Sequence, residues 1–207
     1  KIPRWAFEKF PGADQTLTIQ MKSVGEAMAI GQTFKEALQK GLRSLETGWY
    51  GLDNHPLKDL PLSELPQKLT VPNVERIFYI KQAFQRGLSV DHVHSYTKID
   101  PFFLYNIKEI VEFEAEIREL GKGMNGRAAR STSLLYKAKQ YGFSDRQIAE
   151  LWNISELDVR KIRKEKGIEA TFKTVDTCAA EFEAETPYYY STYGREDEVR
   201  PSPKKKM

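Results

Sequence analysis

Five basic side chains gather near residue 160, and such a cluster could contact nucleic-acid phosphates. Ser144 and Ser155 predict the N-caps of two short helices joined by a turn at 152–154, which matches a helix-turn-helix in length. Leu157, Val159 and Ile162 are then expected to pack inward. Acidic residues interrupt the basic face, so we favour an ordinary helical hairpin over a DNA-binding unit. The basic residues are Arg160, Lys161, Arg163, Lys164 and Lys166.

Other titratable side chains could in principle bind a metal or transfer protons. His92 and His94 are two residues apart, so on one helix they point to different faces and cannot share a metal ion. Paired carboxylates can perform acid–base catalysis, but the glutamates near residue 115 are expected on a solvated face of the helix. These glutamates are Glu112, Glu114, Glu116 and Glu119. The opposite face carries an apolar stripe at helical spacing, which consists of Phe103, Leu104, Ile107, Ile110, Val111, Ile117 and Leu120.

The chain also lacks the local signatures of covalent catalysis and phosphate binding. Cys178 is its only cysteine, which excludes an internal disulfide, and we expect a buried structural thiol. Gly25 and Gly31 do not form the clustered, lysine-associated pattern of a phosphate loop. We therefore predict no catalytic, cofactor-binding or metal-binding residue.

Composition points to a globular chain. It has 207 residues, of which 40% are hydrophobic, with 32 basic and 29 acidic side chains and a net charge of +3. This balance does not favour a nucleic-acid partner, and no uncharged apolar run reaches the ~18 residues of a membrane span. The first residues do not resemble a signal peptide, so we expect a cytoplasmic location without a nucleic-acid or membrane partner.

The first 45 or so residues are expected to combine strands with one helix. Residues 17–22 alternate apolar and polar side chains and 24–30 are short and apolar, which favours sheet. Thr33 and Glu36 are spaced as a capping box, which predicts a helix of about a dozen residues. Its expected buried side chains are Phe34, Ala37, Leu38, Leu42 and Leu45.

Helical signals dominate residues 73–166. Residues 48–71 are expected to form an irregular, proline-rich connection with a short helix near 63–69. After this connection, Gly87 is expected to end one helix and Ser89 to begin the next. Asp100 and Pro101 predict the start of the longest helix, and Gly121 its end. A loop is expected at 121–130, a helix at 132–141, a strand at 171–177 and an extended aromatic stretch at 187–190. The predicted fold class is mainly α, with a short α+β segment before a small all-helical domain and an extended tail after it.

Several motifs, taken together and in order, resemble the large subunit of carbamoyl-phosphate synthetase, bacterial type, where that subunit joins its two synthetase units. The resemblance covers nearly the whole chain. The motifs are Lys-Ile-Pro-Arg-Trp at 1–5, Phe-Glu-Lys-Phe at 7–10, Met-Lys-Ser-Val-Gly-Glu-Ala-Met-Ala-Ile-Gly at 21–31, Gly-Leu-Ser-Val-Asp at 87–91, Ile-Asp at 99–100, Gly-Phe-Ser-Asp at 142–145, Val-Asp-Thr-Cys-Ala-Ala-Glu-Phe at 175–182 and Tyr-Ser-Thr-Tyr at 190–193.

The resemblance implies a division of the chain into four parts. Residues 1–48 would end the first ATP-grasp unit, which makes carboxyphosphate and then carbamate, and 49–70 would be a connection. Residues 71–167 would be the helical oligomerisation domain. Residues 168–207 would be an extended linker toward the second synthetase unit.

The resemblance also implies a function for the parent subunit. Such enzymes make carbamoyl phosphate from bicarbonate, ammonia from glutamine and two ATP, for arginine and pyrimidine biosynthesis. ATP and Mg²⁺ or Mn²⁺ would bind the parent outside this chain, which is expected to be inactive alone and to hold no cofactor. The expected partners are other copies of the large subunit and the glutaminase small subunit.

Two sets of residues are candidates for roles in this setting. The helices offer more apolar surface than one small core absorbs, so aromatic side chains are expected to contact a second copy. These are Phe102, Phe103, Phe113, Tyr141 and Trp152. Lys1, Arg4 and Glu8 would lie in the core of the first unit, where they line the carbamate passage or form an ordinary charge cluster.

Overall fold

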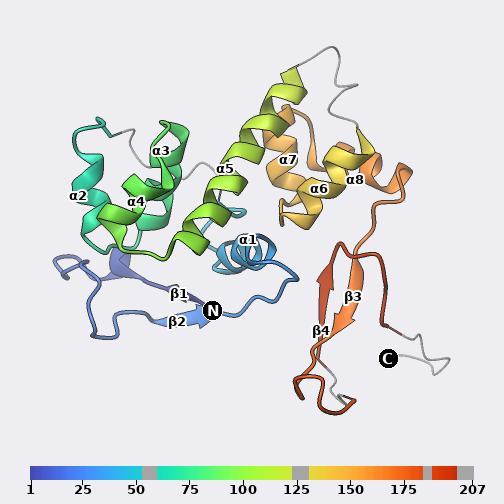
Figure 1. The fold of residues 1–207 in the computed structure, drawn as a ribbon, viewed down its shortest axis with the longest axis horizontal. Helices are drawn as coiled ribbons and strands as arrows, with labels where there is room; N and C mark the ends of the chain where they lie inside the picture. Colours follow the sequence, from blue (N-terminus) through green and yellow to red (C-terminus); the bar gives the residue numbers. More distant parts are fainter. Residues whose placement is uncertain (53–59, 123–130, 184–187, 200–207) are drawn as a thin grey trace.

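Helix α5 (Pro101–Lys122) is the central element of the computed structural model, which describes residues 1–52, 60–122, 131–183 and 188–199. Figure 1 shows α5 running through the middle of the molecule, with α2 (Leu65–Thr70), α3 (Arg76–Gln85) and α4 (Val90–Thr97) on one side. The opposite side carries α6 (Thr132–Gln140), α7 (Asp145–Trp152) and α8 (Glu156–Glu165). Helix α1 (Phe34–Ser44) lies beneath α5 and packs against it.

Two small antiparallel sheets flank the helices. Strand β1 (Ile2–Arg4) pairs with β2 (Gly25–Ala27), and Pro3 lies opposite Glu26. A 3-10 turn, η1 (Phe7–Lys9), follows β1. Strand β3 (Thr171–Thr174) pairs with β4 (Tyr189–Thr192), so that Thr171 lies opposite Thr192. The mainly helical fold class predicted from the sequence is confirmed.

Three serine caps predicted from the sequence are confirmed. The hydroxyls of Ser89, Ser144 and Ser155 each accept a hydrogen bond from the backbone N–H three residues later. At Ser144 the side chain of Gln147 accepts the return bond from the Ser144 backbone N–H, which completes a capping box. Asp100 opens α5, because its carboxylate accepts from the Phe102 N–H at 2.8 Å.

The start of α1 departs from the predicted capping box in one bond. The Thr33 hydroxyl accepts from the Glu36 N–H as expected. The Glu36 carboxylate, however, accepts from the Gln32 N–H at 2.9 Å rather than from Thr33. Phe34, Ala37 and Leu45 are half-buried rather than buried, whereas Leu38 and Leu42 belong to the core. The same carboxylate oxygen, Glu36 Oε2, also accepts from the Thr192 hydroxyl at 3.0 Å.

Gly121 was expected to end the longest helix, and the described part of α5 extends one residue beyond it, to Lys122. A Cβ atom at Gly121 would lie 2.7 Å from Cδ1 of Trp152. The glycine therefore also allows close packing between α5 and α7. Most of the loop predicted at 121–130 lies outside the described residues.

The alternating segment 17–22 forms no strand, although all its residues lie in the described part of the chain. Ile19 and Met21 are exposed, and the Leu17 N–H donates to the carbonyl of Pro72 instead of to a strand neighbour. Alternation predicts a strand only where a pairing edge and a face to bury are present, and neither is available to this segment here. The short helix near 63–69 and the strand near 171 are confirmed, as α2 and β3.

One hydrophobic core runs through the helices. Buried side chains from α1 to α8 belong to a single cluster that ends at Ile168. Val159 packs into it and Ile162 borders it, but Leu157 is exposed, which corrects the predicted inward face of α8. Helix α1 thus shares its core with the helices that follow.

Candidate functional sites

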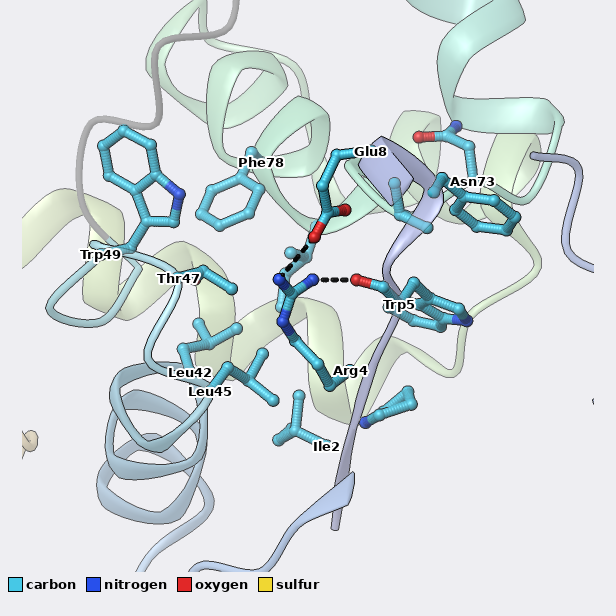
Figure 2. A pocket seen from close by; sticks show the side chains of 14 residues that line it. Ile2, Arg4, Trp5, Glu8, Leu42, Leu45, Thr47, Trp49, Asn73 and Phe78 are labelled. Atoms are coloured by element: carbon cyan, nitrogen blue, oxygen red, sulfur yellow. Dashed lines mark hydrogen bonds and ion pairs between the residues drawn. The ribbon is translucent and has the colours of Figure 1, made fainter. Parts of the chain in front are cut away.

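A pocket of about 350 Å³ opens beside β1. Figure 2 shows side chains from β1, η1, the end of α1 and the start of α3 around it, with the Arg4 guanidinium near its centre. Most of the wall is apolar, including Trp5, Leu45, Trp49 and Phe78. Such a wall with few polar groups is typical of sites that hold a small molecule or line a passage.

The charged residues that line this pocket are Arg4 and Glu8. Arg4 Nη2 lies 2.8 Å from Glu8 Oε1, and its other terminal nitrogen donates to the Trp5 carbonyl. A backbone hydrogen bond and the bond from Arg4 lower the pKa of Glu8, which keeps this carboxylate charged. Lys1 is not a lining residue: its ammonium pairs with Glu26 across the β1–β2 pair at 2.6 Å. The structure therefore brings together two of the three predicted residues.

A second candidate site is an aromatic face, which we define as Phe34, Phe102 and Phe103. The ring centroids of Phe34 and Phe103 are 5.1 Å apart, and those of Phe102 and Phe103 are 5.3 Å apart. Phe102 is 59% exposed and Phe103 41% exposed. Large rings that remain in solvent beside one another are unusual unless another surface covers them.

The other three aromatic candidates for contacts between copies lie elsewhere. Phe113 is 3% exposed and packs against Tyr141, with 5.0 Å between their ring centroids. Trp152 is 9% exposed, and its indole N–H donates to the Ile117 carbonyl at 3.1 Å. Tyr141 is half-buried. Phe113 and Trp152 therefore pack inside this chain. Phe102 and Phe103 remain exposed in the aromatic face.

One predicted solvated carboxylate is buried. Glu114 forms a 2.5 Å ion pair with Lys81 of α3, and both side chains are buried. Arg118 also contacts Glu114, at 2.9 Å. Because α3 supplies the lysine, α3 covers α5 at Glu114, whereas Glu112, Glu116 and Glu119 are exposed as expected. The pair joins α3 to α5 and provides no open acid–base site.

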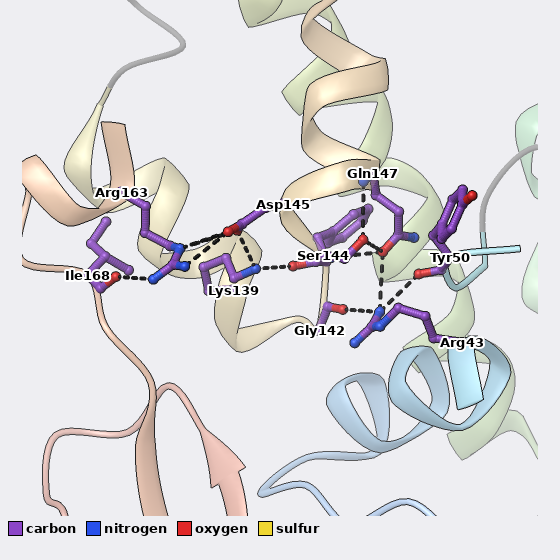
Figure 3. Close-up of polar contacts among 10 residues, drawn as sticks. Arg43, Tyr50, Lys139, Gly142, Ser144, Asp145, Gln147, Arg163 and Ile168 are labelled. Atoms are coloured by element: carbon purple, nitrogen blue, oxygen red, sulfur yellow. Dashed lines mark hydrogen bonds and ion pairs between the residues drawn. The ribbon is translucent and has the colours of Figure 1, made fainter. Parts of the chain in front are cut away.

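A buried charge cluster joins α6, α7 and α8, as Figure 3 shows. Asp145 accepts from Lys139 Nζ at 2.8 Å and from Arg163 Nη2 at 3.0 Å. Arg163 therefore points inward and is not part of the solvated basic face that the sequence predicts for α8. Burial lowers the pKa of Lys139 to about 8, although the negative charge of Asp145 acts to raise it. Burial raises the pKa of Asp145, but Lys139 and Arg163 outweigh it and lower the pKa overall.

A neighbouring polar network connects α1 to the turn between α6 and α7 (Figure 3). Arg43 Nη1 donates to the carbonyls of Tyr50 and Gly142, at 2.9 and 3.0 Å. Gln147 donates to the side-chain carbonyl of Gln39 at 3.2 Å. These contacts fix α1 to the later helices by directional bonds in addition to apolar packing.

The histidines and the cysteine have local contacts. His92 Nδ1 lies 3.0 Å from the Ser89 hydroxyl, and His94 Nδ1 lies 2.7 Å from the Ile99 carbonyl. Cys178 is half-buried rather than buried. Within the described residues, no group of three or more metal-binding side chains is arranged around a common point. None of the described helices has both the length and the apolarity required to cross a membrane.

Comparison with known proteins gives a match over most of this fold. Residues 26–167 match the family described as carbamoyl-phosphate synthetase large chain, oligomerisation domain. The chain belongs to this family. The match extends from β2 through α8, so it includes α1 as well as the helices that share its core.

Relatives of this family extend the likeness over the whole chain. The carbamoyl phosphate synthase large chain of Archaeoglobus fulgidus is 51% identical and that of Thermotoga neapolitana 52% identical, each over 100% of this chain. The N-terminal section of the large chain from Aquifex aeolicus is 54% identical over 94% of this chain. The chain spans only 18 to 34% of the length of these relatives.

Proposed function

We propose that this chain is the part of a carbamoyl phosphate synthase large chain that joins its two synthetase units and associates with a second copy. The family match over residues 26–167 carries the proposal. The division into residues 1–48, 49–70, 71–167 and 168–207 is part of it, with α1 packed on the helical domain. We infer that this segment performs no catalytic step of its own.

The aromatic face is the surface that we assign to self-association. Buried phenylalanine rings contribute strongly to interfaces, because each removes a large apolar area from water. Phe102 and Phe103 lie in the first turn of α5, next to Phe34 of α1. The face is thus supported by two packed helices, and a two-fold contact would set it against its own copy.

Light scattering over a range of protein concentrations tests this assignment. We expect the weight-average mass to rise toward that of a dimer as concentration increases. A strict monomer mass at high concentration contradicts the assignment. A DNA shift assay at increasing salt addresses the rival helix-turn-helix function, for which binding should occur and weaken steeply with salt.

We further propose that the pocket with Arg4 and Glu8 lines the passage that carries carbamate between the two sites of the parent enzyme. A charged pair within an apolar wall can guide a small anion without binding it tightly, which supports this role. Glu8→Ala in the full large chain should change the coupling between the two ATP-dependent steps. Unchanged coupling would assign the pair to a purely structural role, and Glu26→Ala, outside the pocket, is the matched control.

The activity of the parent enzyme follows from the same assignment. We propose that it makes carbamoyl phosphate from bicarbonate, ammonia and two ATP, in the cytoplasm, with Mg²⁺ or Mn²⁺ and with a glutaminase small subunit as partner. The nucleotide and metal sites would lie outside this chain. ATP turnover by the isolated chain would contradict this distribution.

A further inference from the structure

The end of β4 is buried against the helical part, although 168–207 was expected to be an extended linker. Thr192 is 2% exposed, and its hydroxyl donates to Glu36 Oε2 of α1 at 3.0 Å. Glu36 is also 2% exposed. These two residues are 156 positions apart in the sequence, so their contact connects the beginning of the fold to its end.

Neighbouring residues strengthen the same contact. Lys40 pairs with Glu36 Oε1 at 2.7 Å and donates to the carbonyl of Ser191. On the other side of the strand, the ring of Tyr193 lies near two buried cations, 5.1 Å from Lys139 Nζ and 5.8 Å from Arg163 Cζ. Residues 191–193 are therefore held by α1 on one side and by α6 and α8 on the other.

The far end of the β3–β4 pair is held less firmly. Tyr189, opposite Thr174, is exposed, as is Tyr188, and the Thr174 N–H donates to Glu198 of the following segment at 2.7 Å. An isolated two-stranded ribbon is marginally stable in water, because it buries little apolar surface. Glu198 adds backbone and side-chain bonds to β3, but it belongs to the same tail, so the contacts at 191–193 are the ones that position the ribbon against the helices. Buried polar contacts of this kind are directional, so they fix orientation more than they add stability.

We propose that residues 191–193, with Glu36 and Lys40 of α1, form a clasp that locks the β3–β4 ribbon onto the helices. The clasp fixes the direction in which the chain leaves the helical part relative to α1. It connects the segment before the helical part, through α1, with the segment after it, the β3–β4 ribbon, in a fixed arrangement. This inference concerns the fold of the chain itself and does not depend on the parent's activity.

Hydrogen exchange of backbone amides, measured by mass spectrometry, tests the clasp. Thr192→Val keeps the shape of the side chain but removes the hydroxyl that Glu36 accepts from. We expect exchange at 189–194 to accelerate by about tenfold, since the lost bond is to a charged group. Exchange in α5 should not change. Thr174→Val, at the far end of the same ribbon, is the matched control and should leave 189–194 at the wild-type rate.

Thr192→Ser distinguishes the hydroxyl from the methyl group. The serine variant retains the donor, so it should exchange like the wild type at 189–194. Equal exchange in Thr192→Val and Thr174→Val would overturn the clasp. Acceleration spread evenly over the whole chain would also overturn it, because it would show that Thr192 contributes to global stability and does not lock the ribbon.

Discussion

Gly121 lies directly against the indole of Trp152, where a Cβ atom would come within 2.7 Å of Cδ1. Alanine normally stabilises a helix interior relative to glycine, by about 1 kcal/mol. At this position we expect the opposite sign, because the methyl group must displace a buried ring and the backbone of α7. Gly121→Ala should lower the free energy of unfolding by about 1–3 kcal/mol in urea denaturation.

The control for this substitution is Gly25→Ala in β2. A Cβ atom there has no heavy atom within 4 Å outside its chain neighbours, so the change should be small. If Gly121→Ala proves more stable than the wild type, the close approach of α5 and α7 is incorrect.

Asp145 forms ion pairs with both buried cations, Lys139 and Arg163. Asp145→Asn should be strongly destabilising, by about 3–5 kcal/mol, because it leaves buried positive charges without their counter-charge. Chemical denaturation at neutral pH measures the loss. Asp91→Asn, at an exposed position in α4, should cost much less. Equal losses for the two variants would argue against the cluster.

The lowered pKa of Lys139 predicts a pH dependence of stability. The folded protein releases this proton near pH 8, whereas the unfolded chain holds it to about 10.4. Unfolding therefore takes up a proton between these values, so the stability due to this group rises with pH, by at most about 1.4 kcal/mol per unit.

Lys139→Met removes this titration. The difference in unfolding free energy between wild type and Lys139→Met should grow in favour of the wild type from pH 8 to pH 10. Urea denaturation at several pH values provides the comparison. Two curves that remain parallel across this window would show that Lys139 does not titrate there.

The elements that the sequence predicts well are those with local causes. Ser89, Ser144 and Ser155 cap their helices because donor and acceptor are three residues apart, and the apolar stripe of α5 follows from its own period. Gly121 lies within one residue of the described end of α5, but its close approach to Trp152 does not follow from the sequence, because glycine occurs both at helix ends and where two elements approach closely. Residues 17–22 were misinterpreted because alternation indicates a strand only where a partner edge exists.

The candidate sites could be predicted only in part for the same reason. Phe102 and Phe103 lie in one turn, so their shared position follows from helical spacing alone. Whether a ring is exposed depends on the neighbouring helices, which is why Phe113 and Trp152 belong to the core instead. The pair of Glu36 and Thr192 depends on residues far apart in the sequence, as does that of Lys81 and Glu114. No local pattern indicates which buried charge will meet which partner.

Sedimentation velocity of Phe102→Asp/Phe103→Asp tests the central assignment, self-association through the aromatic face, most directly. Acidic residues are compatible with the first turn of a helix, so α5 should still form. We predict that the wild type sediments as a dimer at high concentration and that the double variant remains a monomer. Phe182→Asp, which changes an exposed phenylalanine outside the face, should behave like the wild type. A double variant that dimerises as strongly as the wild type would contradict the account.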